Sequence, residues 1–190
     1  MKASLRRPFL KVVFVVFSLL LLFYLTQGTG EKSVPQSQVV SKVSTGAPVR
    51  LTIPAIDVDA DIQHLGVTPG GEIEVPSNSV DVGWFKLGSR PGEKGSAVIS
   101  GHFDGENGEA GVFTNLHKLV KGDKLYVKDS EGATTTFIVR ESRAYNPGYA
   151  EEVFSLNDIA HLNLVTCDGV WDGAKKSYSK RLVVFADISD

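Results

Sequence analysis

The sequence predicts an all-β domain of about eight short strands, from about Val49 to the C-terminus. Short apolar runs recur along this part of the chain, and several alternate apolar and polar residues as half-buried strands do. Turns rich in glycine, proline, asparagine and aspartate separate these runs, and only one or two short segments have helical spacing. Many short strands with few helices favour a closed or nearly closed β-barrel, although this pattern alone does not separate a barrel from a sandwich.

The composition is that of a globular protein with a hydrophobic core. Of the 190 residues, 42% are hydrophobic and 22% are charged, and the formal net charge is -2. Because these values indicate no strongly basic surface, we expect no nucleic-acid partner. The single cysteine, Cys167, excludes an internal disulfide and a metal site built from cysteines alone.

The N-terminal part of the sequence predicts a membrane anchor and a linker. Residues 1–30 begin with a basic stretch, which the almost wholly apolar run Val12–Leu25 follows. This order places the N-terminus in the cytoplasm and the rest of the chain outside. We favour an uncleaved signal-anchor helix over a cleaved signal peptide, because no clear Ala-x-Ala site follows the apolar run. Residues 31–48 predict a flexible extracellular linker, and residues 49–190 predict the folded domain.

The first predicted strands show the alternation most clearly. Leu51 and Ile53 alternate with polar residues, and the run Ile56–Ile62 then places apolar and acidic residues on opposite faces. The three aspartates of that run could suggest a calcium site, but they lack the tight turn and central glycine of an EF-hand loop. We therefore interpret them as solvated charges and expect no metal site. A further short strand is predicted at Glu72–Val75, between a turn and a proline.

The middle of the chain predicts two helical segments among further strands. A short helix is expected over Val112–Leu119, because Phe113, Leu116 and Val120 would share one face. One helical turn is expected at Val153–Asp158. The remaining elements are a buried aromatic patch at Val82–Phe85 and strands at Ser96–Gly101, Leu125–Val127 and Thr134–Ser142.

The C-terminal part of the chain predicts a cysteine beside an arginine. The apolar run Leu162–Thr166 ends at Cys167, and a loop over Asp168–Ser179 leads to Arg181 and a second apolar run, Leu182–Ala186. Two such runs joined by a loop predict neighbouring antiparallel strands. Cys167 would then lie at the end of one strand, with Arg181 near the start of the next. A fixed positive charge beside a thiol favours the thiolate, which is the form that attacks carbonyl groups.

A thiol nucleophile also needs a proton donor for its leaving group, and histidine suits this role. Of the four histidines, His102 ends the strand Ser96–Gly101 and precedes a turn-prone loop, much as Cys167 ends its own strand. His117 is expected on the surface. His161 precedes Cys167 along an extended run, and its Cα would lie on the order of 20 Å from that of Cys167, too far to act on the thiol.

Three short motifs are present together in this sequence. They are Val165-Thr166-Cys167, the Ser100-Gly101-His102 that closes an earlier strand, and Arg181 at the head of the last strand. This set resembles the signature of the sortase family, and the similarity covers most of the predicted domain. The C-terminal segment that begins Thr166-Cys167-Asp168-Gly169-Val170-Trp171 looks most like class F sortases. Asn163 departs from the family pattern, which has a threonine at this position.

The resemblance implies an eight-stranded sortase β-barrel that acts as a cysteine transpeptidase. Cys167 would be the nucleophile and His102 the general acid and base. Arg181 would stabilise the oxyanion and hold the substrate. The further residues expected to contact the substrate are Thr166, Trp171 and Tyr178.

The resemblance also implies where the reaction takes place and on what. The enzyme would cleave an LPxTG-like sorting signal of a secreted protein after its threonine. It would then transfer the acyl group from a cysteine thioester to an amine of a cell-wall precursor. The chain would be anchored in the cell membrane of a Gram-positive-type envelope, with its catalytic domain outside. No cofactor is expected.

Other readings of the same residues lead to other classes of protein. A membrane-tethered β-barrel that only binds a ligand would have the same anchor and fold, with Cys167 as a buried core residue. An L,D-transpeptidase also combines cysteine and histidine, but its Ser-His-Gly-Cys-like motif is not found at Cys167. Nothing near Cys167 resembles the helix-borne cysteine of papain-like proteases.

Overall fold

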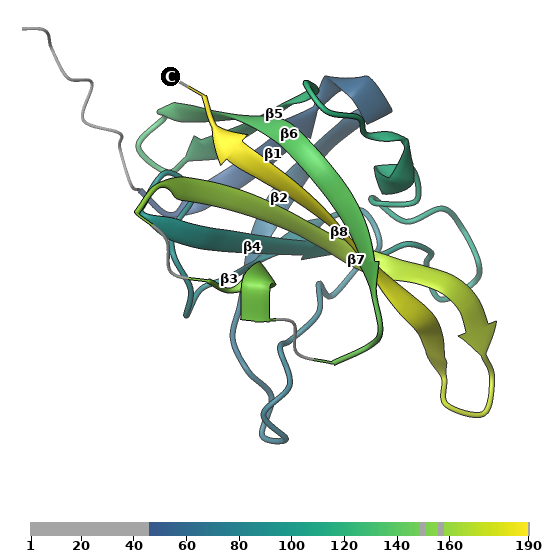
Figure 1. Cartoon of the computed structure of the whole chain (residues 1–190). Coiled ribbons are helices and arrows are strands. Elements are labelled where there is room, and N and C mark those ends of the chain that lie inside the picture. Colours follow the sequence, from purple (N-terminus) through teal and green to yellow (C-terminus); the bar gives the residue numbers. More distant parts are fainter. Residues whose placement is uncertain (1–45, 149–150, 156–157, 190) are drawn as a thin grey trace, which may run out of the picture. The chain divides into compact units, whose positions relative to one another are not determined.

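Eight strands form the framework of the protein in the residues that the computed structural model describes, which are 46–148, 151–155 and 158–189. Figure 1 shows them in chain order, from the blue β1 to the yellow β8. The strands are β1 (Pro48–Ile53), β2 (Val58–Leu65), β3 (Val82–Phe85), β4 (Gly95–Gly101), β5 (Lys124–Asp129), β6 (Thr134–Tyr145), β7 (Ala160–Asp172) and β8 (Ser177–Ile188).

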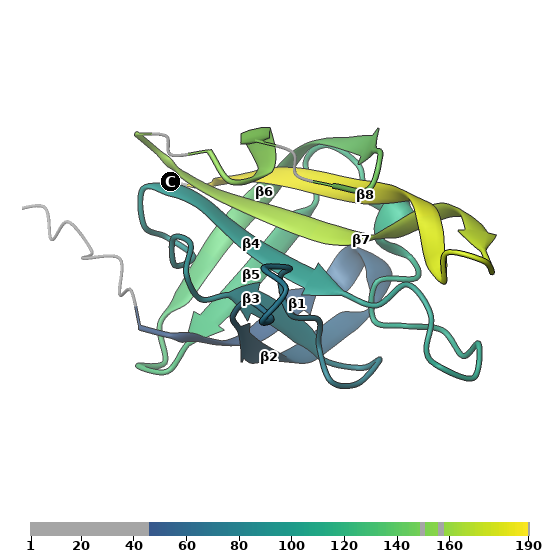
Figure 2. The ribbon, with the colours of Figure 1, turned by 90° about the horizontal axis from the view of Figure 1, so that it is seen from below.

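The described strands close into a barrel. Their order around it is β1-β2-β3-β4-β7-β8-β6-β5, and β5 pairs with β1. The pairs β2 with β3 and β4 with β7 are parallel, whereas the other pairs are antiparallel. Figure 2 shows β4 and β7 side by side in the wall of the barrel. The all-β prediction is confirmed, and the fold is a barrel and not a sandwich.

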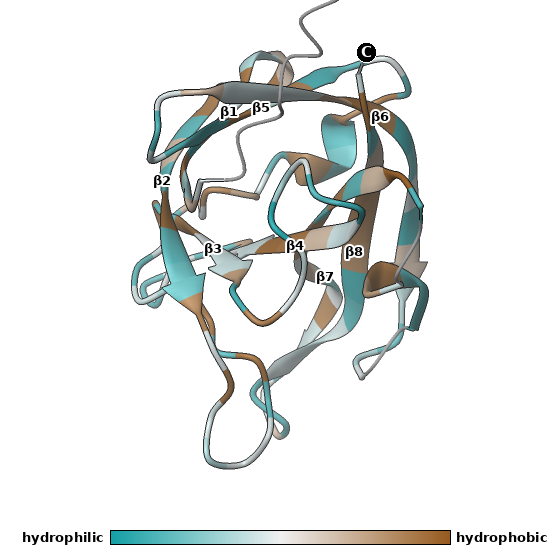
Figure 3. Cartoon of the chain, turned by 90° about the vertical axis from the view of Figure 1, so that its left-hand side faces the viewer, coloured by the Kyte–Doolittle hydropathy of each residue, from teal (hydrophilic) through white to brown (hydrophobic). Residues whose placement is uncertain are grey.

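Apolar side chains at alternate strand positions fill the barrel interior. In Figure 3, brown apolar residues and teal polar residues alternate along the strands. On β2, Val58, Ala60 and Ile62 are buried, whereas Asp59 and Asp61 are exposed, as the alternation predicted. The largest fully buried side chains include Phe113, Phe137, Leu51, Ile53, Ile99, Leu116 and Leu125.

A second apolar cluster covers the outer face of the wall formed by β4, β7 and β8. Val98, Val183 and Phe185 form this outer cluster with Val153, which comes from the segment between β6 and β7, and Val165 packs against it. Their neighbours along these three strands belong to the interior core. The three strands are therefore buried on both faces over much of their length, which explains their continuous apolar sequences.

The helix predicted over residues 112–119 is shorter than expected. Within this segment only Leu116–Lys118 is helical, and it forms a 3-10 turn. A 3-10 helix has about three residues per turn. Leu119 is therefore buried, whereas Val120, which we expected on the same face as Phe113, is 64% exposed.

The strand predicted at Glu72–Val75 does not form. Among the described residues Ile73 makes an isolated bridge with Val67, and the side chain of Val75 is 67% exposed. Alternation predicts a strand only where one face can be buried against other parts of the protein. This segment lies between β2 and β3 without a core to cover, so its pattern was misleading.

The loop predicted over residues 168–179 is mostly strand. β7 continues to Asp172, β8 begins at Ser177, and Trp171 lies opposite Tyr178 across the pair. A cross-strand aromatic pair stabilises such an extension. The ends of both strands project beyond the barrel, as Figure 1 shows. We call residues 168–179 the β7–β8 hairpin.

Some predictions fall partly or wholly outside the described residues. The helical turn expected at Val153–Asp158 is found at Glu151–Val153 as a 3-10 turn, and residues 156–157 are not described. The predicted signal anchor and most of the predicted linker lie in residues 1–45, which are also outside the described part. In the described ranges, no helix combines the length and the hydropathy needed to cross a bilayer.

The closed core predicts a large effect of truncating one interior side chain. We expect Leu125→Ala to lower the free energy of unfolding by about 2–5 kcal/mol, because it leaves a cavity at a fully buried position. Urea denaturation followed by circular dichroism measures this change. The control is Leu87→Ala, whose side chain is 65% exposed and whose loss should cost less than about 1 kcal/mol. Equal effects of the two substitutions would contradict the assigned core.

Candidate active site

Cys167 and Arg181 lie directly opposite each other on β7 and β8. Opposite residues of an antiparallel pair have their Cβ atoms about 4.5–5.5 Å apart and on the same face. The prediction that these two strands are neighbours is therefore confirmed. Cys167 is the only cysteine in the sequence, and its side chain is half-buried.

Strand alternation places both side chains on the outer face of the barrel wall. Successive residues of a strand point to opposite faces. Val165 and Val183 are also opposite each other, and both pack in the outer cluster. Cys167 lies two residues beyond Val165, and Arg181 lies two residues before Val183, so the thiol and the guanidinium continue the outer face.

His102 reaches the same place from β4. This strand is parallel to β7, and the last registered pair lies two residues before His102 on β4 and two before Cys167 on β7. Thr166 Oγ1 then donates a hydrogen bond to the Gly101 carbonyl at 2.8 Å, which holds the strands together for one more residue. His102 therefore follows next to Cys167, and the alternation directs it to the same outer face.

Three contacts fix the backbone and the ring of His102. The Phe113 N–H donates to the His102 carbonyl at 2.9 Å. A Cβ at Gly111 would lie 2.4 Å from that carbonyl oxygen, so only glycine allows this close approach. The ring Nε2 lies 2.8 Å from the Pro76 carbonyl oxygen. Because a carbonyl can only accept, Nε2 carries a proton in this contact, and Nδ1 is the nitrogen left to exchange one.

A pocket with a volume of about 650 Å³ opens beside His102. Its walls come from the segment before β3 and from the loop after β4. The acidic residues that line it are Asp104, Glu106 and Glu109. No lysine or arginine is among the described residues that line it, so the pocket has an acidic character. Neither Cys167 nor Arg181 lines it.

Opposing effects act on the proton of Cys167. Burial raises the pKa of the Cys167 thiol, the positive charge of Arg181 lowers it, and the negative charge of Asp104 raises it. The net result is a pKa above the ordinary thiol value. Arg181 thus favours the thiolate, as the sequence predicted, but it does not outweigh burial, which the sequence could not reveal. The thiol is mostly protonated at neutral pH in this state.

The guanidinium of Arg181 is held by its own strand. Its Nη1 donates to the Lys180 carbonyl at 2.8 Å and to the Tyr178 carbonyl at 3.1 Å. Its Nη2 donates to Ser177 Oγ at 3.2 Å. The orientation of the positive charge therefore depends on the backbone of the β7–β8 hairpin.

The further candidate substrate contacts lie in different surroundings. Thr166 is 3% exposed, and its hydroxyl is engaged with the Gly101 carbonyl in the wall between β4 and β7. Trp171 is 53% exposed on the hairpin. Tyr178 is half-buried, and its ring lies edge to face with that of Trp171, with ring centroids 5.2 Å apart. Trp171 and Tyr178 are therefore accessible to a ligand, whereas Thr166 is directed into the barrel wall.

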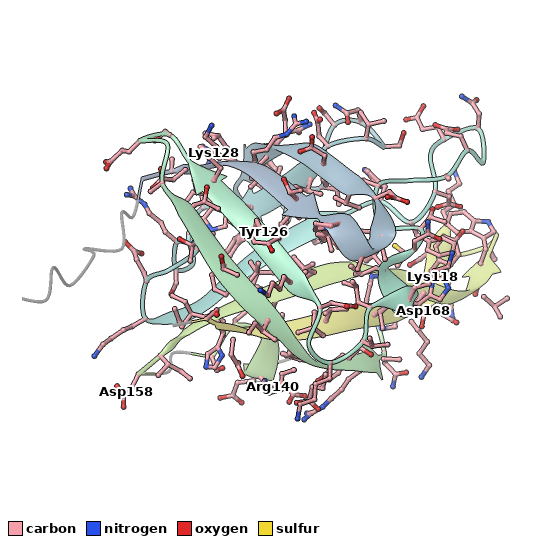
Figure 4. All side chains as sticks on the ribbon, turned by 90° about the horizontal axis from the view of Figure 1, so that it is seen from above. Lys118, Tyr126, Lys128, Arg140, Asp158 and Asp168 are labelled. Carbon is pink, nitrogen blue, oxygen red and sulfur yellow. The ribbon has the colours of Figure 1, made fainter. Side chains whose placement is uncertain are left out.

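The other histidines and the early aspartates lie elsewhere. His161 Nδ1 is 2.7 Å from Asp187 Oδ1 at the start of β7, and His117 is exposed. Figure 4 shows how far apart the two ends of β7 lie: Asp158, just before β7, is at one end of the barrel, and Asp168, near the end of β7, is at the other. The aspartates predicted to be solvated include Asp59 and Asp61, which are exposed and form ion pairs with Arg50.

In the part of the chain that the structure describes, no group of three or more His, Cys, Asp or Glu side chains is arranged to hold a metal ion.

Two contributors to the site were missed in the sequence. Asp104 affects the thiol and accepts a hydrogen bond from the Tyr178 hydroxyl, and Pro76 supplies the acceptor for the His102 ring. Asp104 follows His102 by two residues, which was an available signal, but its contact with Tyr178 depends on the barrel. The Pro76 carbonyl is a backbone group with no signal in the side-chain pattern.

The protein is similar to known structures and to one family model. A family model of the sortase domain matches residues 51–189. Sortase C-1 from Actinomyces oris is 26% identical, with a TM-score of 0.60 over 75% of this chain and 71% of that chain. Sortase A from Corynebacterium diphtheriae is 23% identical, with a TM-score of 0.59 over 78% of this chain and 63% of that chain. No curated protein sequence matches this one.

The family model covers most of the chain. The matched residues include nearly all of the barrel, from β1 to β8, and with it the strands that carry Cys167, His102 and Arg181. The identity to Corynebacterium diphtheriae sortase A supports the fold alone, whereas the family model covers most of the sequence. The chain therefore belongs to the sortase family of cysteine transpeptidases.

Proposed function

We propose that this transpeptidase uses Cys167 as its nucleophile, His102 as its general acid and base, and Arg181 to stabilise the oxyanion. The observation that carries this proposal is the cross-strand pair of Cys167 with Arg181 beside the end of β4. A cysteine transpeptidase needs a thiol, and this sequence contains one. The family assignment also disfavours the alternative of a non-catalytic binding module.

In the first half of the reaction, the Cys167 thiol gives its proton to His102, and its sulfur attacks the carbonyl carbon of the scissile peptide bond. The carbonyl oxygen becomes an oxyanion, beside which the guanidinium of Arg181 supplies N–H donors and positive charge. The C–N bond then breaks, and His102 gives a proton to the departing amine. The product is a thioester on Cys167.

In the second half, an acceptor amine attacks the thioester carbonyl and gives its proton to His102. The C–S bond breaks, an amide forms, and the leaving thiolate takes the proton from His102, which restores the resting thiol. Since Nε2 is engaged with the Pro76 carbonyl, Nδ1 is the nitrogen that exchanges the proton.

The proposed donor substrate is a sorting signal of the LPxTG type, cleaved after its threonine, at the end of a secreted protein. Trp171 and Tyr178 would contact the substrate from the hairpin. Thr166 would act on the substrate only indirectly, by fixing the strand that carries Cys167.

The sequence of the last two strands further supports a class F sortase that attaches its substrates to an amine of a cell-wall precursor. The solved structures reported above are of classes A and C.

We also propose the arrangement predicted from the sequence. In it, a signal anchor within residues 1–30 lies in the cell membrane, residues 31–48 form a linker, and residues 49–190 act outside the membrane of a Gram-positive-type envelope.

The proposed nucleophile predicts a covalent intermediate. Mixed with a panel of short sorting peptides, the protein should gain the mass of an acyl group on Cys167, as detected by mass spectrometry. Cys167→Ala should form no adduct and transfer no peptide to an amine. Leu87→Ala, at an exposed position, should behave like the unchanged protein. Transfer by the Cys167→Ala variant would exclude Cys167 as the nucleophile.

The proposed role of Arg181 predicts a graded loss of activity. Arg181→Ala should lower kcat/KM for peptide transfer by at least about 10²-fold, on the scale of losing an oxyanion donor. Arg181→Lys keeps the charge but loses the planar set of donors. Its kcat/KM should therefore lie between those of the unchanged protein and Arg181→Ala. A fluorogenic peptide assay measures these rates. A near-normal rate for Arg181→Ala would show that the guanidinium only supports the strand.

The pKa of Cys167 predicts the pH dependence of its reactivity. Because burial raises the pKa of the Cys167 thiol, iodoacetamide should alkylate it faster as the pH rises, with a midpoint above that of an ordinary thiol. Arg181→Ala removes the charge that lowers this pKa, so the midpoint should move to higher pH. Mass spectrometry of timed samples gives the rates. A midpoint that moves to lower pH would contradict the assigned effect of Arg181.

A further inference from the structure

The β7–β8 hairpin carries a pair of aromatic side chains at its projecting end. Trp171 and Tyr178 are opposite each other, and their rings are in edge contact. Gly169 has φ 83° and lies in the register shift between Asp168 and Trp171, where a side chain would be strained. This hairpin extends beyond the closed barrel (Figure 2), so its position depends on few neighbours.

The loop that follows β4 supplies one such neighbour. The Tyr178 hydroxyl donates a hydrogen bond to Asp104 Oδ2. The ring of Phe103 lies in edge contact with the ring of Tyr178, with centroids 5.5 Å apart. Tyr178 therefore joins the hairpin to the segment that carries His102, although the two are far apart in the sequence.

The same hairpin also orients the guanidinium of Arg181. Two of its described acceptors, the Tyr178 carbonyl and Ser177 Oγ, belong to the hairpin. A movement of Tyr178 would therefore displace both the acceptors of Arg181 and the contact with Asp104. The position of the hairpin and the charges at the thiol are linked through this one residue.

We propose that Asp104 is a positioning residue that holds the β7–β8 hairpin to the histidine segment through Tyr178 and places a negative charge near Cys167. The contact fixes the backbone on which Arg181 rests. At the same time the carboxylate opposes the positive charge of Arg181 at the sulfur. Asp104 thus sets both the geometry and the resting reactivity of the site, and a substrate that displaces Tyr178 would change both.

The charges that face the thiol come from two elements. Arg181 lies opposite it on β8, and Asp104 comes from the loop after β4. His102 lies beside it at the end of β4. Tyr178 of β8 carries no charge at physiological pH, because its hydrogen bond to Asp104 raises the pKa of Tyr178 to about 12. The negative charge that opposes a thiolate is therefore that of Asp104.

The pH profile of alkylation tests the charge effect. Asp104→Asn keeps an oxygen that accepts from Tyr178 but loses the charge. Iodoacetamide should therefore modify Cys167 at least about twofold faster at pH 7, with a midpoint at lower pH. The matched control is Glu72→Gln, which removes one exposed negative charge elsewhere and should leave the profile unchanged. A midpoint for Asp104→Asn equal to or above that of the control would overturn the proposal.

Hydrogen exchange tests the positioning effect. Tyr178→Phe keeps the ring and its aromatic contacts but loses the hydroxyl. Amide exchange over residues 169–179 should therefore be about tenfold faster, as expected for the loss of one hydrogen bond to a charged group. Because Asp104 keeps its charge, the alkylation midpoint of this variant should not fall. Unchanged exchange in the hairpin, or a midpoint that falls as in Asp104→Asn, would refute the proposed link.

This inference rests on the proposed role of Cys167, but its tests do not need turnover. Alkylation and hydrogen exchange are measured on the protein without a peptide substrate. If sorting peptides form no adduct on Cys167, the proposed function fails while both tests still report on Asp104. If the peptides react but both tests fail, the proposed function stands and the role of Asp104 is lost.

Discussion

Thr166 donates a hydrogen bond to the carbonyl of Gly101, and this contact holds the ends of β4 and β7 in one register. The register matters because successive strand residues face opposite sides of the sheet, so a slip by one position would reverse every side chain. In the observed register His102, Cys167 and Arg181 all continue the outer face of the same wall. The strand order gives β7 both β4 and β8 as neighbours.

The chemistry of the site follows from its place on a partly covered outer face. Neighbouring apolar side chains of the outer cluster exclude water from the wall, and burial raises the pKa of the Cys167 thiol. Arg181 opposes this effect, while Asp104 adds to it. The resting thiol is thus held mainly in its protonated form, which limits unwanted reactions of a lone cysteine. A bound peptide would change this balance through the hairpin that carries both Tyr178 and the acceptors of Arg181.

The sequence predicted the parts of the fold that alternation and turns determine. β2 and the neighbouring pair of β7 and β8 were predicted because burial on one face or continuous apolar runs leave a direct signal. The extension of the hairpin was not predicted, since Trp171 and Tyr178 pair only once the strands are aligned. The 3-10 turn at Leu116–Lys118 was not predicted for a similar reason, because its buried face depends on which residues the barrel covers.

The same distinction applies to the site. Cys167, His102 and Arg181 were predicted from strand-end positions and from a family resemblance, which require no knowledge of distances. The effect of Asp104 on the thiol and the acceptor supplied by Pro76 are tertiary contacts between loops, and no pattern along the chain encodes them. The net pKa of the thiol depends on burial, which a sequence pattern does not measure.

The meeting of β4 with β7 beside the thiol can be measured directly with a second cysteine. In His102→Cys the Cα of the new cysteine should lie one strand spacing, about 4.8 Å, from the Cα of Cys167, which is within the Cα–Cα range that a disulfide spans. Mild oxidation should therefore remove both free thiols and form an intramolecular disulfide, whereas His64→Cys, on β2, should keep both. If the two thiols of His102→Cys remain free under these conditions, the histidine and the cysteine do not share one site.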